Sequence, residues 1–256
     1  MKKSLTKPAR RMLSVALRGL RDHISASARS RRATQPVERQ RRNPSRAAIF
    51  TRIYHSNVWG GRAGEYYSGG GSDEPFSGAY SEFINAFLDQ LPERPLTVVD
   101  IGCGDFRVGV RVHTPGMLYV GVDLVPELIE RNSNLFGSSS VRFVCLDVVE
   151  ETPPDGDVCL IRQVFQHLSN SDIALILPRL RKYRYLFVTE HRPLDVHDVS
   201  ANLDKPTGHA TRMTMESGVY LDQPPFNLED VHTVLEIPSD QDGALVTVFV
   251  EQDIEA

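Results

Sequence analysis

An apolar segment that runs directly into a glycine turn constrains the fold more than any other part of this 256-residue chain. Residues Leu96–Ile101 are mostly apolar and rich in valine, which predicts a strand buried on both faces. The glycines of the next three residues, Gly102-Cys103-Gly104, permit a tight turn and let backbone N–H groups approach a ligand. In an open parallel sheet the ligand crevice lies at the carboxyl end of such a strand. We therefore expect an α/β fold with a binding site beside this turn.

The residues around the turn limit which ligand can bind there. A dinucleotide fingerprint needs a third glycine, which lets a helix pack closely and places the pyrophosphate at the helix N-terminus. Arg107 occupies that position, so the fingerprint fails. The chain also lacks the Gly-x-x-x-x-Gly-Lys-Ser/Thr pattern of a triphosphate-binding loop. The pattern that is present is an acidic residue, Asp100, followed by Gly-x-Gly, which is compatible with a binding site for another ligand. The alternative interpretation is a tight turn without a ligand in some other α/β protein.

The next predicted strand, residues 118–123, ends in a second acidic residue. Asp123 lies 21 residues after Gly102. A carboxylate at this place can accept hydrogen bonds from both ribose hydroxyls of a nucleoside. The alternative is an N-cap for the helix predicted over 126–136, which opens with Pro126. We favour the ribose role, with Leu124 beside the carboxylate.

Two more predicted strands end at the same edge of the sheet. Residues 141–147 end in Asp147, which could accept a hydrogen bond from an adenine amino group, and residues 157–162 run into Gln163. Such residue types suit an adenosine ligand with a neutral ribose and a cationic sulfonium. The predicted cofactor-binding residues are Asp100, Gly102, Cys103, Gly104, Asp123, Leu124, Asp147, Val148 and Gln163.

The remaining periodicity completes the predicted sheet. A fifth strand is expected over 185–190, and residues 231–237 and 244–251 alternate around a turn, which predicts an antiparallel hairpin. The fold class is therefore α/β: a Rossmann-like, seven-stranded, mostly parallel sheet with a C-terminal antiparallel hairpin, preceded by a basic N-terminal tail. Helices are predicted over 76–91, 105–113, 126–136 and, kinked by Pro178, 171–183.

Charge divides the chain into a basic tail and an acidic domain. Residues 1–46 hold 14 Lys and Arg against Asp22 and Glu38, a charge of +12, which leaves −16 for the domain of residues 47–256. Leucines at helical spacing in the tail indicate a basic amphipathic helix on an anionic membrane surface; an organelle transit peptide and a disordered tail are the alternatives. The acidic body argues against nucleic acid as a partner.

The three cysteines, Cys103, Cys145 and Cys159, fall in or beside predicted strands without metal-like spacing. A sparse, buried, odd-numbered set indicates a reducing compartment. We expect a cytoplasmic protein, with the inner membrane surface as the alternative location. No metal site is predicted, because Asp195, His197 and Asp198 are best explained as a solvated polar loop.

Several motifs together resemble class I S-adenosylmethionine (SAM)-dependent methyltransferases. The resemblance covers Tyr54 to Glu251. The chain is most specifically similar to bacterial members that show Trp-Gly, then Ser-Gly-x-Gly-Ser, and Gly-Asp-Phe after the first strand. Some of these members occur with surface-polysaccharide genes. This sequence has Trp59-Gly60, Ser68–Ser72, Gly104-Asp105-Phe106 and Val125-Pro126-Glu127-Leu128-Ile129. Arg107-Val108 departs from the more usual Asn-Trp, which bears on the acceptor rather than the cofactor.

The resemblance implies methyl transfer from SAM to a small polar acceptor, which we expect to be a hydroxyl of a sugar or glycan precursor. The loop of residues 59–72 and the stretch of residues 191–228 would hold it through Trp59, Arg212, Tyr220 and Asp204. Arg212 could instead anchor its own loop. A hydroxyl acceptor needs a base, for which His191 and His167 are the candidates, although His167 could simply pack against the sheet.

Two other functions stay open from the sequence. One is a non-catalytic SAM- or adenosine-binding module that docks through its basic tail. The other is a methyltransferase that acts on a protein or a nucleic acid. Methylation of a base or amide nitrogen is disfavoured, because Arg162 to Phe165 do not form Asn/Asp-Pro-Pro-Tyr/Phe.

Overall fold

The structure is a computed structural model that describes residues 44–92, 95–194, 200–239 and 243–253. The predicted tail helix lies outside these residues, as do the polar loop of Asp195, His197 and Asp198 and most of the hairpin turn. Within the described ranges, no helix has both the length and the apolar character needed to cross a membrane.

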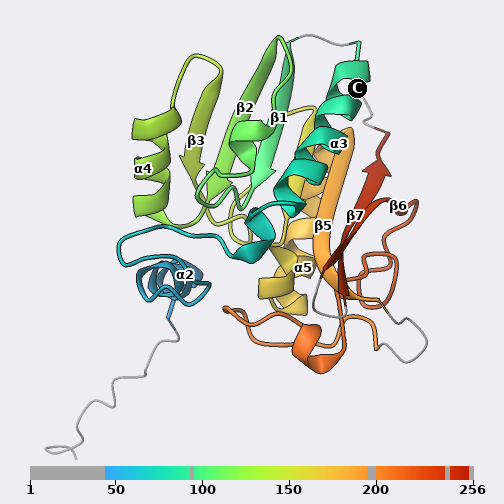
Figure 1. Ribbon diagram of the computed structural model, residues 1–256. Helices are drawn as coiled ribbons and strands as arrows, with labels where there is room; N and C mark the ends of the chain where they lie inside the picture. Colours follow the sequence, from blue (N-terminus) through green and yellow to red (C-terminus); the bar gives the residue numbers. More distant parts are fainter. Residues whose placement is uncertain (1–43, 93–94, 195–199, 240–242, 254–256) are drawn as a thin grey trace, which may run out of the picture. The chain divides into compact units, whose positions relative to one another are not determined.

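The described residues form one seven-stranded sheet in the order β3-β2-β1-β4-β5-β7-β6 (Figure 1). The first five strands are parallel, and β7 pairs antiparallel with both β5 and β6. This arrangement confirms the Rossmann-like sheet with a C-terminal hairpin. The strands are β1 (Leu96–Ile101), β2 (Met117–Asp123), β3 (Val141–Cys145), β4 (Val158–Arg162), β5 (Tyr185–Pro193), β6 (His232–Ser239) and β7 (Gly243–Glu251).

Strand order reverses beside β1, which places a crevice there. Asp100 of β1 is in register with Gly121 of β2 on one side and Leu160 of β4 on the other. The chain moves outward through β2 and β3 and then returns to β4. Ligands of open α/β sheets bind at the carboxyl ends of the strands where the order reverses. The predicted site therefore has the expected topological position.

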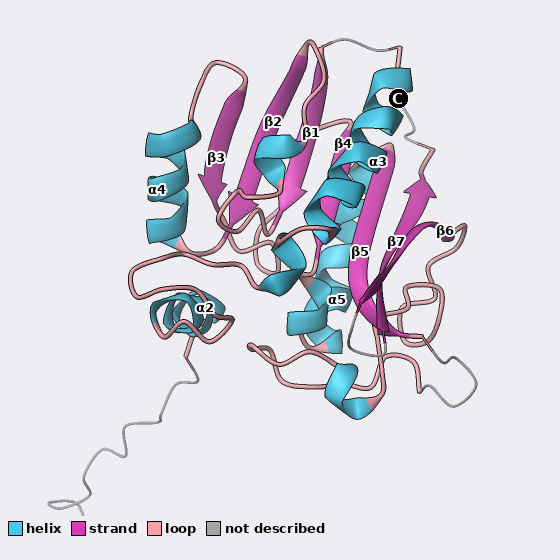
Figure 2. Ribbon diagram, in the orientation of Figure 1, coloured by secondary structure: helices cyan, strands magenta, loops and turns pink. Residues whose placement is uncertain are grey.

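Helices cover both faces of the sheet (Figure 2). Apolar residues of α3 (Phe76–Gln90) pack into one core cluster through Tyr80, Ile84 and Leu88. The opposite cluster takes the apolar residues of three other helices. These are α2 (Arg46–His55), α4 (Pro126–Phe136) and α5 (Asn170–Ile176).

Short 3-10 turns replace regular helix at several connections. The helix predicted over 105–113 is reduced to η2 (Gly109–Arg111), because Phe106 adopts φ +65° and interrupts a helical course. Regular helix also ends before Pro178, whose ring removes a backbone donor; residues Leu177–Lys182 continue as η4. The other turns are η1 (Gly70–Ser72), η3 (Phe165–His167) and η5 (Met213–Met215).

Helix α2 was not predicted. Arg46, which the charge pattern placed at the end of the tail, is its first residue, and Ser45 caps it by accepting a hydrogen bond from the Ala48 N–H. Figure 1 shows α2 on the side toward which the β1, β2 and β3 arrows point. The helix therefore lies beside the predicted binding edge.

Candidate active site

One cavity at the carboxyl ends of β1, β2 and β4 brings the predicted cofactor residues together. Its lining includes all nine of them, from four separate segments of the chain. Trp59 and His167, predicted for the acceptor and for catalysis, also line it. The lining cofactor residues are Asp100, Gly102, Cys103, Gly104, Asp123, Leu124, Asp147, Val148 and Gln163.

The glycine turn after β1 has no room for side chains. Gly102 and Gly104 adopt φ +75° and φ +54°. A Cβ on Gly102 would lie 2.3 Å from Cγ2 of Val164, and one on Gly104 would lie 2.4 Å from Oγ of Ser68. Both the backbone conformation and the close neighbours therefore require glycine here.

Backbone donors hold the Asp123 carboxylate at the cavity wall. Its Oδ2 accepts from the Gly104 N–H at 3.2 Å and its Oδ1 accepts from the Val125 N–H at 3.1 Å. Burial raises the pKa of Asp123 to about 6. Each carboxylate oxygen can accept a second hydrogen bond, so the group can still take two hydroxyl donors.

Asp147 is fixed from two sides. Its Oδ1 accepts from the Val149 N–H at 3.0 Å, and its Oδ2 accepts from Nε of Arg46 at 2.9 Å. The same guanidinium also pairs with Asp172 at 3.2 Å and with Glu150. Arg46 thus joins the start of α2 to three carboxylates beyond β3, and it lines the cavity itself.

The deep end of the cavity holds an acid and a cation from neighbouring strands. Asp100 accepts a hydrogen bond from the Tyr119 hydroxyl, and burial raises its pKa to about 6. Arg162, at the end of β4, lies over the ring of Tyr80, with its guanidinium carbon 5.1 Å from the ring centroid. All three side chains, Asp100, Arg162 and Tyr80, line the cavity.

Gln163 has an unusual backbone conformation for a residue other than glycine. Its φ is +56°, and its N–H donates to the Thr189 carbonyl at 2.7 Å. Its side-chain amide lies against Gly71 of η1, where a Cβ would approach Oε1 to 2.0 Å. The glycine loop and the end of β4 therefore meet at close range.

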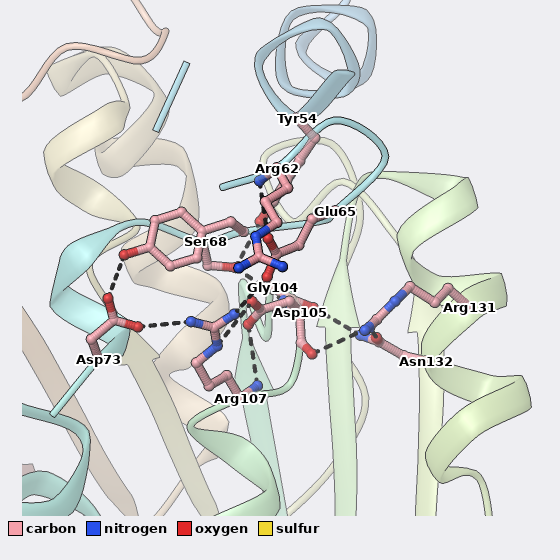
Figure 3. A network of polar contacts seen from close by, with 11 residues as sticks. Tyr54, Arg62, Glu65, Ser68, Asp73, Gly104, Asp105, Arg107, Arg131 and Asn132 are labelled. Carbon is pink, nitrogen blue, oxygen red and sulfur yellow. Dashed lines mark hydrogen bonds and ion pairs between the residues drawn. The ribbon is translucent and has the colours of Figure 1, made fainter. Parts of the chain in front are cut away.

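Arg107 ties the segment before α3 to the glycine turn (Figure 3). Its guanidinium pairs with Asp73 at 2.7 Å and with Glu65 at 3.3 Å. Ser68 Oγ accepts from the Asp105 N–H at 3.0 Å. The residue that excluded a dinucleotide fingerprint therefore has a structural role: it holds the loop of residues 60–73 against the turn.

Aromatic rings form the outer wall. Trp59 packs edge-on against Tyr54 with ring centroids 5.2 Å apart, and its ring lies 4.9 Å from that of His167. Burial lowers the pKa of His167 to about 4, so its imidazole is neutral at pH 7. A base with so low a pKa is weak near neutrality, which argues against proton removal and for hydrogen bonding to a ligand.

His191, the other catalytic candidate, is not among the residues that line the cavity, so the structure does not bring it to the predicted site. Strand β5 extends through Pro193, which keeps His191 within the sheet, paired with Leu245 of β7. Its Nε2 shares a hydrogen bond of 2.9 Å with Oγ of Ser239. The side chain therefore faces the hairpin.

Arg212 is a structural residue, which corrects its prediction as a substrate ligand. It is 1% exposed. Nε donates to the Leu203 carbonyl at 2.9 Å, and Nη2 donates to the Leu168 carbonyl at 2.9 Å and to Asn170 at 2.8 Å. Nη1 donates to two further carbonyls of η3. All three nitrogens are used, so Arg212 anchors its loop, the alternative left open from the sequence.

Asp204 and Tyr220, also predicted to bind the acceptor, lie outside the cavity lining. Asp204 Oδ1 accepts from the N–H groups of Asn170 and Lys205, and so stabilises the loop. The Tyr220 ring lies under the guanidinium of Arg192, 4.6 Å from its carbon. Of the four predicted acceptor residues, the structure brings only Trp59 to the cavity.

The predicted site lacked seven polar residues of the lining: Arg46, Tyr54, Ser68, Ser72, Tyr80, Asp105 and Arg162. A signal for α2 was present, because Ser45 precedes apolar residues at 49, 50, 53 and 54, a spacing that buries one helical face. Cys145 is exposed, contrary to the expected buried set, and the three cysteines are free. Among the described residues, no group of three His, Cys, Asp or Glu side chains could hold a metal ion.

The sequence matches no protein-family model and no curated protein. Solved structures share the fold. N-methyltransferase NodS from Bradyrhizobium japonicum WM9, in complex with S-adenosyl-L-homocysteine, is 13% identical with a TM-score of 0.54, over 82% of this chain and 100% of that chain. The [4+2]-cyclase SpnF is 13% identical with a TM-score of 0.54, over 83% and 98%.

A third structure, the CMeT domain of the citrinin polyketide synthase, is 11% identical with a TM-score of 0.50, over 71% of this chain. This chain spans only 54% of that structure, and also 54% of the CurJ carbon methyltransferase structure. At these identities the likeness establishes the fold class alone.

Proposed function

We propose that this chain binds SAM and transfers its methyl group to a small polar acceptor. The observation that carries the proposal is the convergence of nine predicted cofactor residues, from four segments, on one cavity at the point where strand order reverses. NodS shares the fold and was solved with S-adenosyl-L-homocysteine bound, which supports the choice of SAM as the cofactor.

The residues of the cavity fit this cofactor. Asp123 has acceptor capacity for two ribose hydroxyls, and Asp147, in the same cavity lining, is the acceptor that we assign to the adenine amino group. The turn at Gly102 and Gly104 lets the backbone approach without a Cβ. When bound, SAM supplies an activated methyl on a cationic sulfonium. The chain then mainly aligns the acceptor with that methyl, and such positioning can contribute about 7–11 kcal/mol.

A hydroxyl of a sugar or glycan precursor is the acceptor we propose. Its support is the half-buried face of Trp59 at the cavity wall, with the neutral imidazole of His167 beside it. An indole ring can pack against the apolar face of a sugar, and a neutral histidine can hydrogen-bond to a hydroxyl. The proposed acceptor site does not include Arg212, Asp204 or Tyr220.

Calorimetry with S-adenosylhomocysteine tests the cofactor site. We expect binding that weakens roughly 10-fold or more in Asp123→Ala, because the ribose loses its charged acceptor. Asp253→Asn, an exposed change outside the cavity lining, is the matched control. No binding by the wild-type protein would refute the proposal. A second assay incubates the protein with labelled SAM and a metabolite extract. If S-adenosylhomocysteine binds but no compound of the extract becomes methylated, the protein is better explained as a binding module.

We also propose that the basic segment of residues 1–46 makes a peripheral contact with an anionic membrane surface, which would place the protein in the cytoplasm at the inner membrane face. The charge of +12 supports this, since each basic residue near such a surface contributes about 1 kcal/mol. Full-length protein should bind anionic vesicles at low salt and dissociate at high salt. Equal binding by a chain that starts at Pro44 would contradict the contact.

A further inference from the structure

Buried polar atoms that lack a partner concentrate in the cavity. In the described part of the chain, four buried side-chain polar atoms make no hydrogen bond, and three of them belong to residues of the cavity lining. They are the Tyr80 hydroxyl, Nε of Arg162 and Nδ1 of His167. Buried polar groups are almost always satisfied, so unpartnered atoms in a cavity lining are candidate contacts for a ligand.

Arg162 is the charged member of this set and has the greatest need of a partner. Nη1 donates to Gln163 Oε1 at 3.3 Å and Nη2 donates to the Gly71 carbonyl, while Nε stays free. Arg46 and Arg107 each pair with aspartates, but within the ranges that the structure describes Arg162 forms no ion pair. Burial lowers the pKa of Arg162, and the charges of Asp100 and Glu190 oppose that shift from a distance. Since no carboxylate of the described residues hydrogen-bonds to the guanidinium, a bound anion would supply a direct charged partner.

The shape of the free donors indicates which anion fits. A guanidinium offers five N–H groups in a planar fork, and the bonds to Gln163 and Gly71 leave Nε and part of each Nη available. A carboxylate matches such a fork with two parallel hydrogen bonds. Asp100, one strand away in the same cavity, is the complementary acid for an ammonium.

We propose that Arg162, with Tyr80 beneath its guanidinium, forms a carboxylate-binding subsite at the deep end of the cavity. The proposal rests on the proposed function, because SAM carries a carboxylate on its amino-acid end. A carboxylate on the methyl acceptor is the other source of the same chemistry. Arg162 is then a residue that sets ligand specificity.

Calorimetry with two ligands separates the carboxylate from the rest of the cofactor. The ligands are S-adenosylhomocysteine and its decarboxylated form, which keeps the adenosine, the thioether and the amine. Wild-type protein should prefer the first by roughly 10- to 100-fold, the value of a charge-assisted pair. Arg162→Gln should bring the two affinities within about threefold of each other, mainly by weakening the carboxylate ligand. Arg142→Gln, an exposed change on β3, should keep the wild-type preference.

A second arm tests the acceptor as the source. If Arg162→Gln leaves the preference unchanged, propionate is titrated into protein saturated with S-adenosylhomocysteine. Binding that Arg162→Gln abolishes assigns the subsite to an acidic acceptor. Arg162→Lys, which keeps the charge but loses the fork, replaces the glutamine variant should that one fail to fold.

An unchanged preference together with no propionate binding overturns the subsite. Failure of the wild-type protein to bind S-adenosylhomocysteine refutes the proposed function instead, and in that case propionate binding to the free protein still decides whether Arg162 holds a carboxylate.

Discussion

Replacing Arg46 by glutamine should loosen helix α2 over the cavity without unfolding the sheet. The Arg46 side chain is 21% exposed, and its partners Asp147 and Asp172 are 23% and 13% exposed. Glu150, the third partner, is 69% exposed. The two shielded pairs should each contribute more than a surface ion pair, and the exposed pair should contribute little. We expect a total of about 2–3 kcal/mol for the attachment of α2.

That loss should raise the population of the detached helix roughly 30- to 150-fold. The apolar residues Phe50, Ile53 and Tyr54 would still favour docking, so the helix stays mostly in place. Hydrogen exchange of the amides of residues 50–58 measures the change directly. Dissociation of S-adenosylhomocysteine should accelerate in parallel, because Phe50, Tyr54 and Trp59 of this segment line the cavity.

Arg52→Gln is the matched control, since it removes the same charge from an exposed position of the same helix. Equal exchange rates in the two variants would show that the three ion pairs do not hold α2. High salt should move the wild-type protein part of the way toward Arg46→Gln, because the pair with Glu150 is the one most open to screening.

Three further outcomes are expected. Gly71→Ala should weaken cofactor binding with little change in melting temperature, because the added methyl group displaces the Gln163 amide. Gly208→Ala is the control, since a Cβ there meets no atom within 4 Å, and equal cofactor affinities of the two variants would contradict the contact. Arg212→Ala should destabilise the fold by about 3–5 kcal/mol in urea denaturation, because four carbonyls lose a buried donor; an unchanged midpoint would refute its anchoring role. Burial raises the pKa of Asp123 from 3.8 to about 6, so the folded form binds more protons than the unfolded form, and stability falls as pH rises from about 4 to about 6. Asp123→Asn should lose this pH-dependent contribution. Equal pH slopes of the melting temperature in the wild-type protein and the variant would refute it.

The cofactor end of the site could be predicted because it depends on local sequence. Each of Asp100, Asp123 and Asp147 ends or closely follows an apolar strand segment, and parallel strands bring such ends to one edge. Strand periodicity and turn glycines are visible within ten residues of sequence. Strand bounds were accordingly within two residues at most ends, although β5 runs on to Pro193 where the prediction stopped at 190.

The acceptor end could not be predicted in the same way. His191 and Arg212 both come after the fifth strand as predicted, residues 185–190, but His191 lies in the longer observed strand and Arg212 turns inward to carbonyls of η3. Whether a polar side chain faces a ligand or a backbone carbonyl depends on long-range packing, which no local pattern records. Arg46 shows the same limit, because its partners are more than a hundred residues away.

That separation has a consequence for how the protein is made. The partners of Arg46 are Asp147, Glu150 and Asp172, which follow it in the chain by 101, 104 and 126 positions. Helix α2 therefore leaves the ribosome long before any of these carboxylates has been synthesised. During synthesis its apolar face has no surface to dock on, and contacts of such long sequence separation form late in folding. The segment made first among the described residues would therefore be the last to settle, and a nascent chain released before Asp172 would lack part of the cover of its own cavity.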